Sequence, residues 1–197
     1  MAHDRASGSV LRLAEEALPI SVRTATAADA PAIAVIGQVA FPALHEHIVG
    51  AEFSAAVVAQ TYSIEALNDC IARCASADDA EFLVAERGGT VVGYLHYDCE
   101  GKEPELHRIY VDPALKRSGI GSALMDDLHA RLPLGCSYVL LVAEENESAQ
   151  RFYERHGLIT ESRIDGPSYY RDAMKLELDA QLPAAPAVLL RFTKTAG

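Results

Sequence analysis

The sequence predicts a mixed α/β fold in which helices flank a twisted sheet. Two observations support this prediction. Residues 82–97 and 105–111 have the residue types and the two-residue period of strands, whereas residues 120–132 repeat apolar side chains every four positions, as one helix face does. Strand-like and helical segments continue to alternate toward the C-terminus, which excludes a four-helix bundle and an all-β fold.

Length and composition indicate one folded domain. The chain has 197 residues, of which 50% are hydrophobic and 23% are charged, and this excludes a disordered chain. Its 28 acidic residues outnumber 17 basic ones, for a formal net charge of −11. We therefore expect neither nucleic acid nor an anionic membrane as a partner, because both are bound by clustered Lys and Arg. A cationic small molecule is compatible with this charge.

The four cysteines, at positions 70, 74, 99 and 136, include no Cys-x-x-Cys pair. Their spacing favours reduced thiols over a metal site. No apolar run approaches the roughly 20 residues that cross a bilayer, and the first residues lack the charged and apolar regions of a secretory signal. We therefore expect a cytoplasmic protein without a bound metal.

We divide the chain into an N-terminal arm (1–19), one domain (20–178) and a C-terminal extension (179–197). The arm contains a short amphipathic piece that ends at Pro19. The extension contains an apolar run over 188–192, which we interpret as an extra edge strand.

The first third of the domain is expected to hold one strand followed by helices. Thr26 and Asp29 have the spacing of a capping box at a helix start. Phe41-Pro42 is expected to end this helix, because a proline inside a helix removes a hydrogen bond and clashes with the preceding turn. The other elements expected here are a strand over 20–24, a helix over 51–60 and a helix capped by Ser63 that runs through Ile71.

The rest of the domain alternates strands and helices. Arg87-Gly88-Gly89 separates two strand-like segments, 82–86 and 90–97, and predicts a hairpin turn. The remaining elements expected are strands over 105–111, 138–143, 158–164 and 170–178, and helices over 120–132 and 147–156.

The segment from Lys116 to Ser122, Lys-Arg-Ser-Gly-Ile-Gly-Ser, joins a strand to a helix. Such a turn leaves backbone N–H groups unpaired at the positive end of the helix dipole, where an anion such as a pyrophosphate binds. Glycine allows a close approach because it has no Cβ. Leu124 occupies the third glycine position of the Rossmann pattern, and the Gly-Lys-Ser/Thr of a P-loop is missing. Alone, the segment fits an anion site and an ordinary helix start equally well.

A second segment, about 20 residues further on, resembles a motif of the GNAT superfamily of acetyl-CoA-dependent N-acetyltransferases. That motif reads Val-x-x-x-Asn-x-x-Ala-x-x-x-Tyr-x-x-x-Gly-Phe. The residues that match it are Val142, Asn146, Ala149, Tyr153 and Gly157, with Leu158 in the Phe position. The glycine turn resembles the family's pyrophosphate loop, Gln/Arg-x-x-Gly-x-Gly/Ala, and the strand over 105–111 resembles the stretch that leads into it. The resemblance covers about residues 20–178.

This resemblance implies a GNAT-like acyl-CoA N-acyltransferase fold. Its twisted, mixed sheet has six to seven strands and splays between the strands 105–111 and 138–143. Two residues depart from the family pattern. Lys116 replaces Gln or Arg and loses the planar fork, although an ammonium still acts as a point charge near phosphate. Leu158 keeps an aliphatic core residue.

The resemblance also implies a binding site for acetyl-CoA, without a metal. The backbone amides that would bind the pyrophosphate are those of Arg117, Gly119, Gly121 and Ser122. The main chain of Ile109 and Val111 would pair with the pantetheine arm and polarise the thioester carbonyl. Asn146 would bond the pantetheine amides, unless it is only a helix cap. The further residues placed at the cofactor are Tyr110, Ser118, Ile120, Ala149 and Tyr153.

Acetylation of an amine requires a base and an acid. An alkylamine of pKa about 10.4 is almost fully protonated at pH 7, so a carboxylate or imidazole must accept its proton. Glu105 lies where some GNAT members carry a catalytic glutamate, and His107 points to the same side of the strand. A water chain is the alternative, with Glu105 then a solvated residue at the strand end. The family role of Tyr153 is to protonate the leaving thiolate; the alternative is a packed helix tyrosine.

The sequence thus predicts an N-acetyltransferase that acts on a primary amine by direct attack. Polyamine-like amines, amino acids, antibiotic amines and peptides remain open as acceptors, and the segment order loosely resembles bacterial polyamine acetyltransferases. Residues 41–55 and 168–171 are candidates for acceptor contact, whereas His45 and His47 are interpreted as surface histidines. Two alternatives remain: a non-catalytic acyl-CoA-binding module and a nucleotide-binding regulatory domain. Dimerisation is common in the family, and the apolar run 188–192 could support it.

Overall fold

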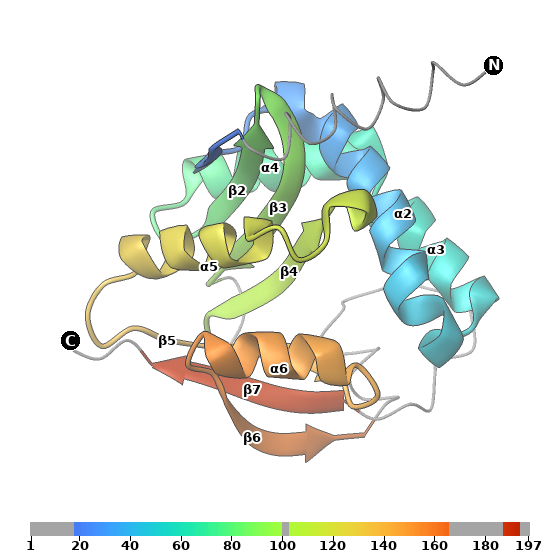
Figure 1. Ribbon diagram of the computed structural model, residues 1–197, viewed down its shortest axis with the longest axis vertical. Coiled ribbons are helices and arrows are strands. Elements are labelled where there is room, and N and C mark those ends of the chain that lie inside the picture. The colour runs from blue at the N-terminus through green and yellow to red at the C-terminus, as the bar shows by residue number, and fades with distance from the viewer. Residues whose placement is uncertain (1–17, 100–102, 166–186, 194–197) are drawn as a thin grey trace, which may run out of the picture.

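A single sheet of seven strands organises the molecule, with the strand order β1-β2-β3-β4-β5-β7-β6 (Figure 1). The computed structural model describes residues 18–99, 103–165 and 187–193. The strands are β1 (Ile20–Thr24), β2 (Glu81–Arg87), β3 (Thr90–Asp98), β4 (Glu105–Val111), β5 (Ser137–Ala143), β6 (Ile159–Ile164) and β7 (Ala187–Thr193). The helices are η1 (Ala27–Asp29), α2 (Ala30–Val49), α3 (Ala51–Thr61), α4 (Ile64–Ser76), η2 (Pro113–Leu115), α5 (Ile120–Arg131) and α6 (Glu147–Arg155). The predicted mixed α/β fold is confirmed.

Local sequence signals account for several of these boundaries. The Ser63 hydroxyl accepts a hydrogen bond from the backbone N–H of Ala66 at 3.1 Å and caps α4, as predicted. Gly88 and Gly89 both have positive φ, 59° and 79°, and form the tight turn between β2 and β3. The predicted N-terminal arm up to residue 17 and the predicted strand 170–178 lie outside the described residues.

The expectation that Phe41-Pro42 ends the first helix is wrong, because α2 continues through Pro42 to Val49. A proline in a helix interior costs about 3 kcal/mol through its lost hydrogen bond and its clash. Here the buried side chains of Ile33 and Phe41 before Pro42, and of Val49 after it, pack into the core. Tertiary packing therefore outweighs the local penalty.

The stretch Ala27–Val49 has 23 residues, and its most apolar window has a mean hydropathy of 1.4, which by length and composition would suffice to cross a membrane. This differs from the expectation that no apolar run is long enough. Of its most apolar window, 44% is buried inside the fold, where it covers one face of the sheet. The apolar character of this helix is therefore accounted for by the core of the domain.

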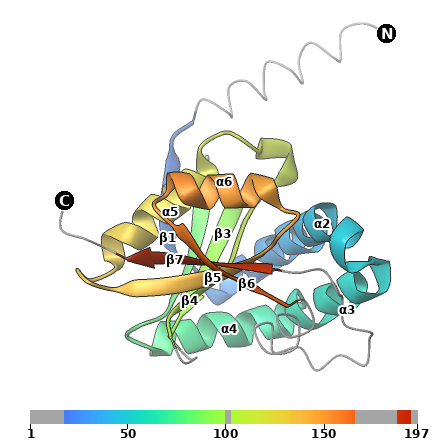
Figure 2. The same ribbon diagram turned by 90° about the horizontal axis from the view of Figure 1, so that it is seen from below.

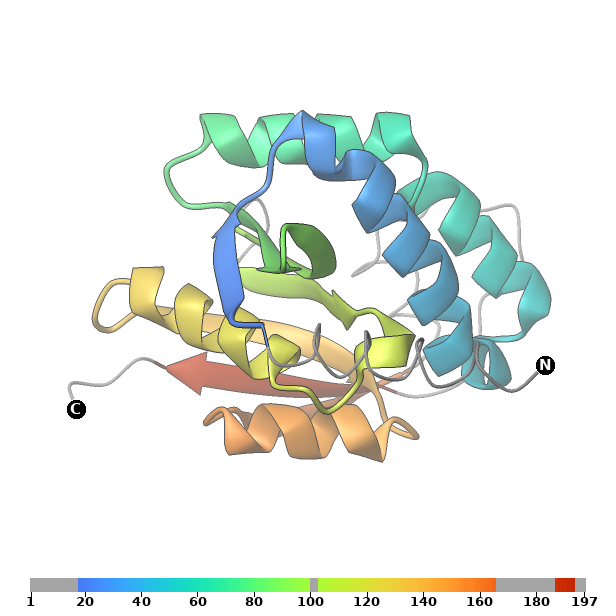
Figure 3. The ribbon, with the colours of Figure 1, turned by 45° about the horizontal axis from the view of Figure 1, so that its top comes forward.

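Two cores lie on opposite faces of the sheet. One is formed by α2, α3 and α4 against side chains such as Phe82, Val84 and Tyr94. The other is formed by α5 against Leu83, Leu95 and residues of β5 and β7. Figure 2 shows α5 and α6 on one side of the sheet and α4 on the other. Helices α2 and α3 lie side by side (Figure 3).

The sheet splays between β4 and β5, as predicted. Within the described residues these two parallel strands are in register only at Glu105 and Val139. The apolar run 188–192 does form a strand, but it is not at the edge. Strand β7 pairs with β5 on one side and with β6 on the other. The edge assignment is wrong because β6 pairs with the second main-chain edge of β7 and itself takes the outer position in the sheet.

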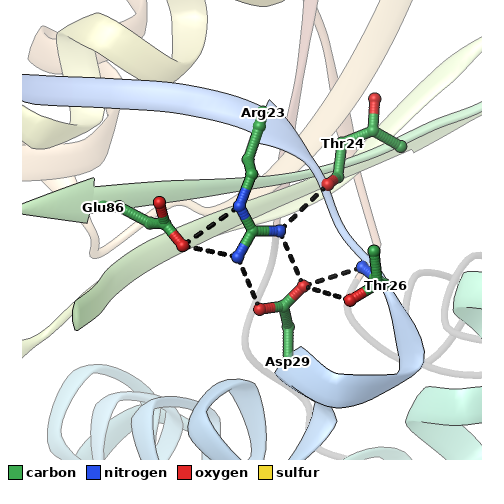
Figure 4. Close-up of polar contacts among 5 residues, drawn as sticks. All are labelled: Arg23, Thr24, Thr26, Asp29 and Glu86. Atoms are coloured by element: carbon green, nitrogen blue, oxygen red, sulfur yellow. Dashed lines mark hydrogen bonds and ion pairs between the residues drawn. The ribbon is translucent and has the colours of Figure 1, made fainter. Parts of the chain in front are cut away.

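An ion-pair cluster joins the start of α2 to the sheet (Figure 4). The guanidinium of Arg23 on β1 donates to both carboxylate oxygens of Asp29, at 2.8 Å each, and to Glu86 on β2. Asp29 also accepts from the N–H and the hydroxyl of Thr26. The predicted capping box is therefore present, and it links the start of α2 to two strands.

Candidate functional site

A cleft opens where β4 and β5 diverge, and it consists of two connected cavities. One extends toward the start of α5 and the other toward α2 and α3. The residues that line both are Leu44, Ile109, Tyr110, Asn146, Ala149 and Tyr153. We call the cavity that extends toward the start of α5 the loop cavity, and the cavity that extends toward α2 and α3 the helix cavity.

The loop cavity is lined by the glycine turn singled out in the sequence. Arg117 and Gly119 have positive φ of 65° and 84°, so the turn reverses direction twice before Ile120 begins α5. A run of alternating backbone conformations of this kind directs N–H groups into a common concavity that suits an anion. The predicted residues found in this cavity are Lys116, Arg117, Gly119, Ile120, Gly121 and Ser122. Ser118 is in the turn and supports it through hydrogen bonds.

Hydrogen bonds hold the turn from behind. The Ser118 hydroxyl donates to the carbonyl of Leu115 at 2.6 Å. Arg87, at the end of β2, donates from Nη2 to the carbonyl of Ser118 at 3.1 Å, and its other two guanidinium nitrogens, Nε and Nη1, are buried without a hydrogen-bond partner among the described residues. A buried positive charge therefore lies directly behind the glycine turn. This contact could not be predicted from the sequence, where Arg87 shows only the pattern of a hairpin turn.

The main chain of β4 is exposed at the cleft. The N–H of Asp112 bonds to Val92 on β3. Neighbouring residues of a strand direct their main-chain groups to opposite sides. The N–H and C=O groups of Val111 and Ile109 therefore point away from β3, toward the side on which β5 diverges. This is the placement that the sequence predicted for these two residues.

A β-bulge in β4 changes which side chains enter the helix cavity. His96 pairs with Arg108 and Tyr97 with Leu106, so His107 is an extra residue in β4. As a result, Glu105, His107 and also Arg108 line the same cavity. Strict alternation would place Arg108 on the opposite face from its neighbour His107. The sequence analysis missed Arg108 for this reason, since a bulge has no signal in a single sequence.

Ionisable side chains form a chain that leads inward from the cavity. His107 Nδ1 lies 3.6 Å from the Glu105 carboxylate, and His107 Nε2 lies 3.0 Å from Asp98. The other oxygen of Asp98 lies 3.3 Å from Nε2 of His96. Glu105 and His107 are 24% and 20% exposed, whereas Asp98 and His96 are buried. The two predicted bases are thus adjacent, and Asp98 is a partner that the sequence analysis did not identify.

Tyr153 lies on α6 and lines both cavities, at the point where they meet. Burial raises the pKa of its phenol well above the ordinary value. Tyr153 therefore keeps its proton at any physiological pH and presents a hydrogen-bond donor to the cleft. Asn146 caps α6 by accepting from the N–H of Ala149 at 3.2 Å, and the same residue lines the cleft.

The interpretation of His45 as a surface histidine is wrong. His45 lines the helix cavity; its ring packs at a tilt against Phe41 with centroids 4.8 Å apart and lies 3.2 Å from the Tyr110 hydroxyl. Burial, followed by the nearby His47, lowers the pKa of His45 to about 4. His45 is therefore neutral at pH 7. Phe41, Leu44 and Val49 also line this cavity, whereas residues 168–171 lie outside the described part of the chain.

The fold brings together two groups of side chains that could hold a metal ion. The first comprises Cys70, Cys74 and His96; the second comprises His96, Asp98 and His107. A hydrogen bond from Cys74 lowers the pKa of Cys70 and raises that of Cys74. The sequence analysis missed the first group because His96 comes from a distant strand. The expectation that the protein binds no metal stays a prediction.

The motifs in this cleft are those of a known family. Residues 78–157 match the protein-family model described as an acetyltransferase (GNAT) domain. The matched segment includes the glycine turn and most of the Asn-Ala-Tyr-Gly motif, up to Gly157. The resemblance inferred from the glycine turn and the Asn-Ala-Tyr-Gly motif is thereby confirmed.

Two curated relatives match part of the chain. An uncharacterized N-acetyltransferase of Methanocaldococcus jannaschii is 34% identical over 98 residues, which cover 45% of this chain and 43% of the relative. The mycothiol acetyltransferase of Thermobispora bispora is 36% identical over 92 residues, or 41% of this chain and 30% of the relative. The chain thus spans less than half the length of the curated relatives it matches.

Solved structures agree on the fold over a longer range. The PaiA N-acetyltransferase from Thermoplasma acidophilum, crystallised in complex with coenzyme A, superposes with a TM-score of 0.68 at 19% identity. The superposition covers 89% of this chain and 99% of that one. The elements of the GNAT fold therefore extend well beyond the matched segment 78–157.

Proposed function

We propose that this protein transfers an acetyl group from acetyl-CoA to a primary amine, which attacks the thioester directly. One observation carries the proposal: an anion-binding turn and a carboxylate–imidazole pair line two cavities that meet beside Tyr153. The coenzyme A bound to the T. acidophilum relative supports this cofactor. The acceptor is a small molecule or a peptide.

In this proposal the cofactor occupies the loop cavity. Its pyrophosphate accepts hydrogen bonds from the main chain of Arg117, Gly119, Gly121 and Ser122, at the positive end of α5. Lys116 and Arg117 add positive charge, and Arg87 adds more from behind the turn. The main chain of Ile109 and Val111 binds the pantetheine arm as a further strand would, in the space that the splay leaves open.

The acceptor occupies the helix cavity, where Glu105 and His107 are positioned to accept the amine proton. Only the neutral amine is nucleophilic, and general-base catalysis contributes about 10²- to 10⁴-fold in rate. Asp98 orients His107 from the other side through the 3.0 Å contact at Nε2. A water chain to the same carboxylate would serve the same purpose.

Tyr153 acts on the departing sulfur. A phenol with a raised pKa is a weaker acid than a thiol of pKa about 8.5, so complete proton transfer to the thiolate would be uphill. We therefore assign Tyr153 the donation of a hydrogen bond to the sulfur as negative charge develops there. This refines the expectation that Tyr153 protonates the thiolate.

The test is release of free thiol from acetyl-CoA across a panel of amines. We expect Tyr153→Phe to lower kcat by about 10- to 100-fold, because one hydrogen bond to a charged group is lost. We expect Glu105→Gln to lower kcat/KM by about 10²-fold or more, most strongly at low pH, where little neutral amine is present. The control is Glu147→Gln on the exposed face of α6, which should leave turnover unchanged.

The outcomes separate the residue roles from the activity. Unchanged turnover in both variants would remove the roles of Tyr153 and Glu105 while leaving the activity standing. Calorimetric binding of coenzyme A without turnover of any amine would favour the non-catalytic acyl-CoA-binding module instead. A cytoplasmic location and a homodimer stay predictions.

A further inference from the structure

Arg108 is a charged side chain of the helix cavity that the proposed chemistry does not use. It lines the cavity together with Glu105 and His107. Its guanidinium carbon lies 5.7 Å from the ring centroid of Tyr62, in a cation–π contact. Its Nη1 atom is buried and has no hydrogen-bond partner among the described residues.

The other arginines with described ion pairs have carboxylate partners. Each of them lies within ion-pair distance of an Asp or Glu: Arg23, Arg131, Arg151, Arg163 and Arg191. Arg108 and Arg87 differ from these, and Arg87 lies behind the glycine turn, where it donates to the carbonyl of Ser118. The ionisable groups that act on it most strongly are phenols and the Cys70 thiol, and no carboxylate is among them.

A guanidinium is never neutral in a protein, and it carries five donors in a rigid plane. Burying such a group without an anionic partner is unfavourable. The natural partner is a group with two coplanar oxygen acceptors, which the guanidinium fork binds through two parallel hydrogen bonds. A carboxylate on the ligand has this geometry.

We propose that Arg108 binds a carboxylate of the acceptor, so that the acceptor is a compact amino acid-like molecule. This inference rests on the proposed function and specifies its substrate class. The bulge at His107 sets a base and a fixed positive charge next to each other in β4. An amine at Glu105 or His107 and a carboxylate at Arg108 then belong to one small ligand. A polyamine would instead place a second positive charge beside Arg108, so the fit to polyamine-like acceptors is poor.

The test compares acceptors in pairs that differ only in a carboxylate: phenylalanine with phenethylamine, ornithine with putrescine, and arginine with agmatine. We expect wild-type kcat/KM to favour the carboxylate member of at least one pair by about 10- to 100-fold, mainly through KM. Arg108→Gln should abolish that preference by lowering kcat/KM of the carboxylate member to the value of its decarboxylated amine. Arg108→Lys keeps the charge without the fork and should retain part of the preference.

Two controls exclude a loss of folding. Arg151→Gln removes an exposed arginine on α6 and should leave kcat/KM unchanged for both members of each acceptor pair. Thermal unfolding of each variant shows whether it is folded, and Arg108→Lys serves if Arg108→Gln is not. The proposal is overturned if the wild type prefers the decarboxylated amines, or if the Arg108 variants slow both members of each pair equally.

Failure of the proposed function gives a different result. If no amine is acetylated, the same pairs are titrated into the protein saturated with coenzyme A and followed by calorimetry. Saturable heat for the carboxylate members that is lost in Arg108→Gln would support the carboxylate site without the enzyme. The same heat in wild type and variant, or no heat in either, would overturn it.

Discussion

The ion pair between Arg23 and Asp29 shows how one charge-assisted contact stabilises the junction between β1 and α2. Its hydrogen bonds, above all those from Arg23, lower the pKa of Asp29 from 3.8 to about 2. A shift of this size corresponds to about 2.4 kcal/mol at neutral pH. Arg23 is 39% exposed, so solvent screening reduces the contribution to about 1–2 kcal/mol.

We therefore predict that Asp29→Asn lowers the free energy of unfolding by about 1–2 kcal/mol at pH 7. The folded pKa lies below the unfolded one, so this stabilisation is complete above about pH 4 and is lost as the pH falls toward 2. Urea unfolding of wild type and variant from pH 7 to pH 3 measures the difference, which should shrink with acidity. Asp127→Asn, which breaks an exposed pair within α5, should cost less than about 0.5 kcal/mol. An Asp29 effect independent of pH would contradict the assignment.

Among the elements, the turn between β4 and α5 depends most on its backbone conformation. Gly119 has φ of 84°, and the nearest atom to an added Cβ is 3.9 Å away, so a side chain there meets strain but no clash. Gly135, in the turn between α5 and β5, has φ of 80° with nothing within 4 Å of such a Cβ. The two glycines therefore form a matched pair, one in the cleft and one outside it.

We predict that Gly119→Ala and Gly135→Ala each lower stability by about 1 kcal/mol, because alanine is strained at positive φ. Only Gly119→Ala should weaken coenzyme A binding, by about tenfold (~1.4 kcal/mol), because its strain redirects the amides of the turn. Thermal unfolding and calorimetric titration measure the two effects separately. Equal affinity of both variants for coenzyme A would remove the turn from the binding site.

At the scale of the whole molecule, β7 holds the C-terminal half of the sheet together. It runs between β5 and β6, and its Leu190 is fully buried. The cleft depends on this arrangement, because β5 leads into α6, which is capped by Asn146 and carries Tyr153. Residues close to the C-terminus therefore support the site from a distance.

We predict that Leu190→Ala lowers the free energy of unfolding by about 2–5 kcal/mol, as large-to-small core substitutions do. Leu134→Ala is the control, because Leu134 is 70% exposed and its loss should change stability by no more than about 0.5 kcal/mol. Denaturant unfolding of both variants measures the two changes in the free energy of unfolding. Similar small losses would show that β7 does not bury this side chain in the core.

The sequence by itself determined the class of fold, most element boundaries and the motif residues of the cleft. These features depend on local rules: the period of apolar side chains, the cap at Ser63, the glycines of the turns and the spacing from Gly119 to Gly157. Each rule acts over a few residues, so a single chain displays it. The splay between β4 and β5 could be predicted only through the family resemblance.

Only the tertiary structure decided the rest. It showed that α2 passes through Pro42, that β7 lies inside the sheet, that His45 is neutral within the cavity, and that a bulge places Arg108 beside His107. The physical reason is the same in each case. Burial against distant residues outweighs a local preference of a few kcal/mol, and the partners that supply this burial are not neighbours in the sequence.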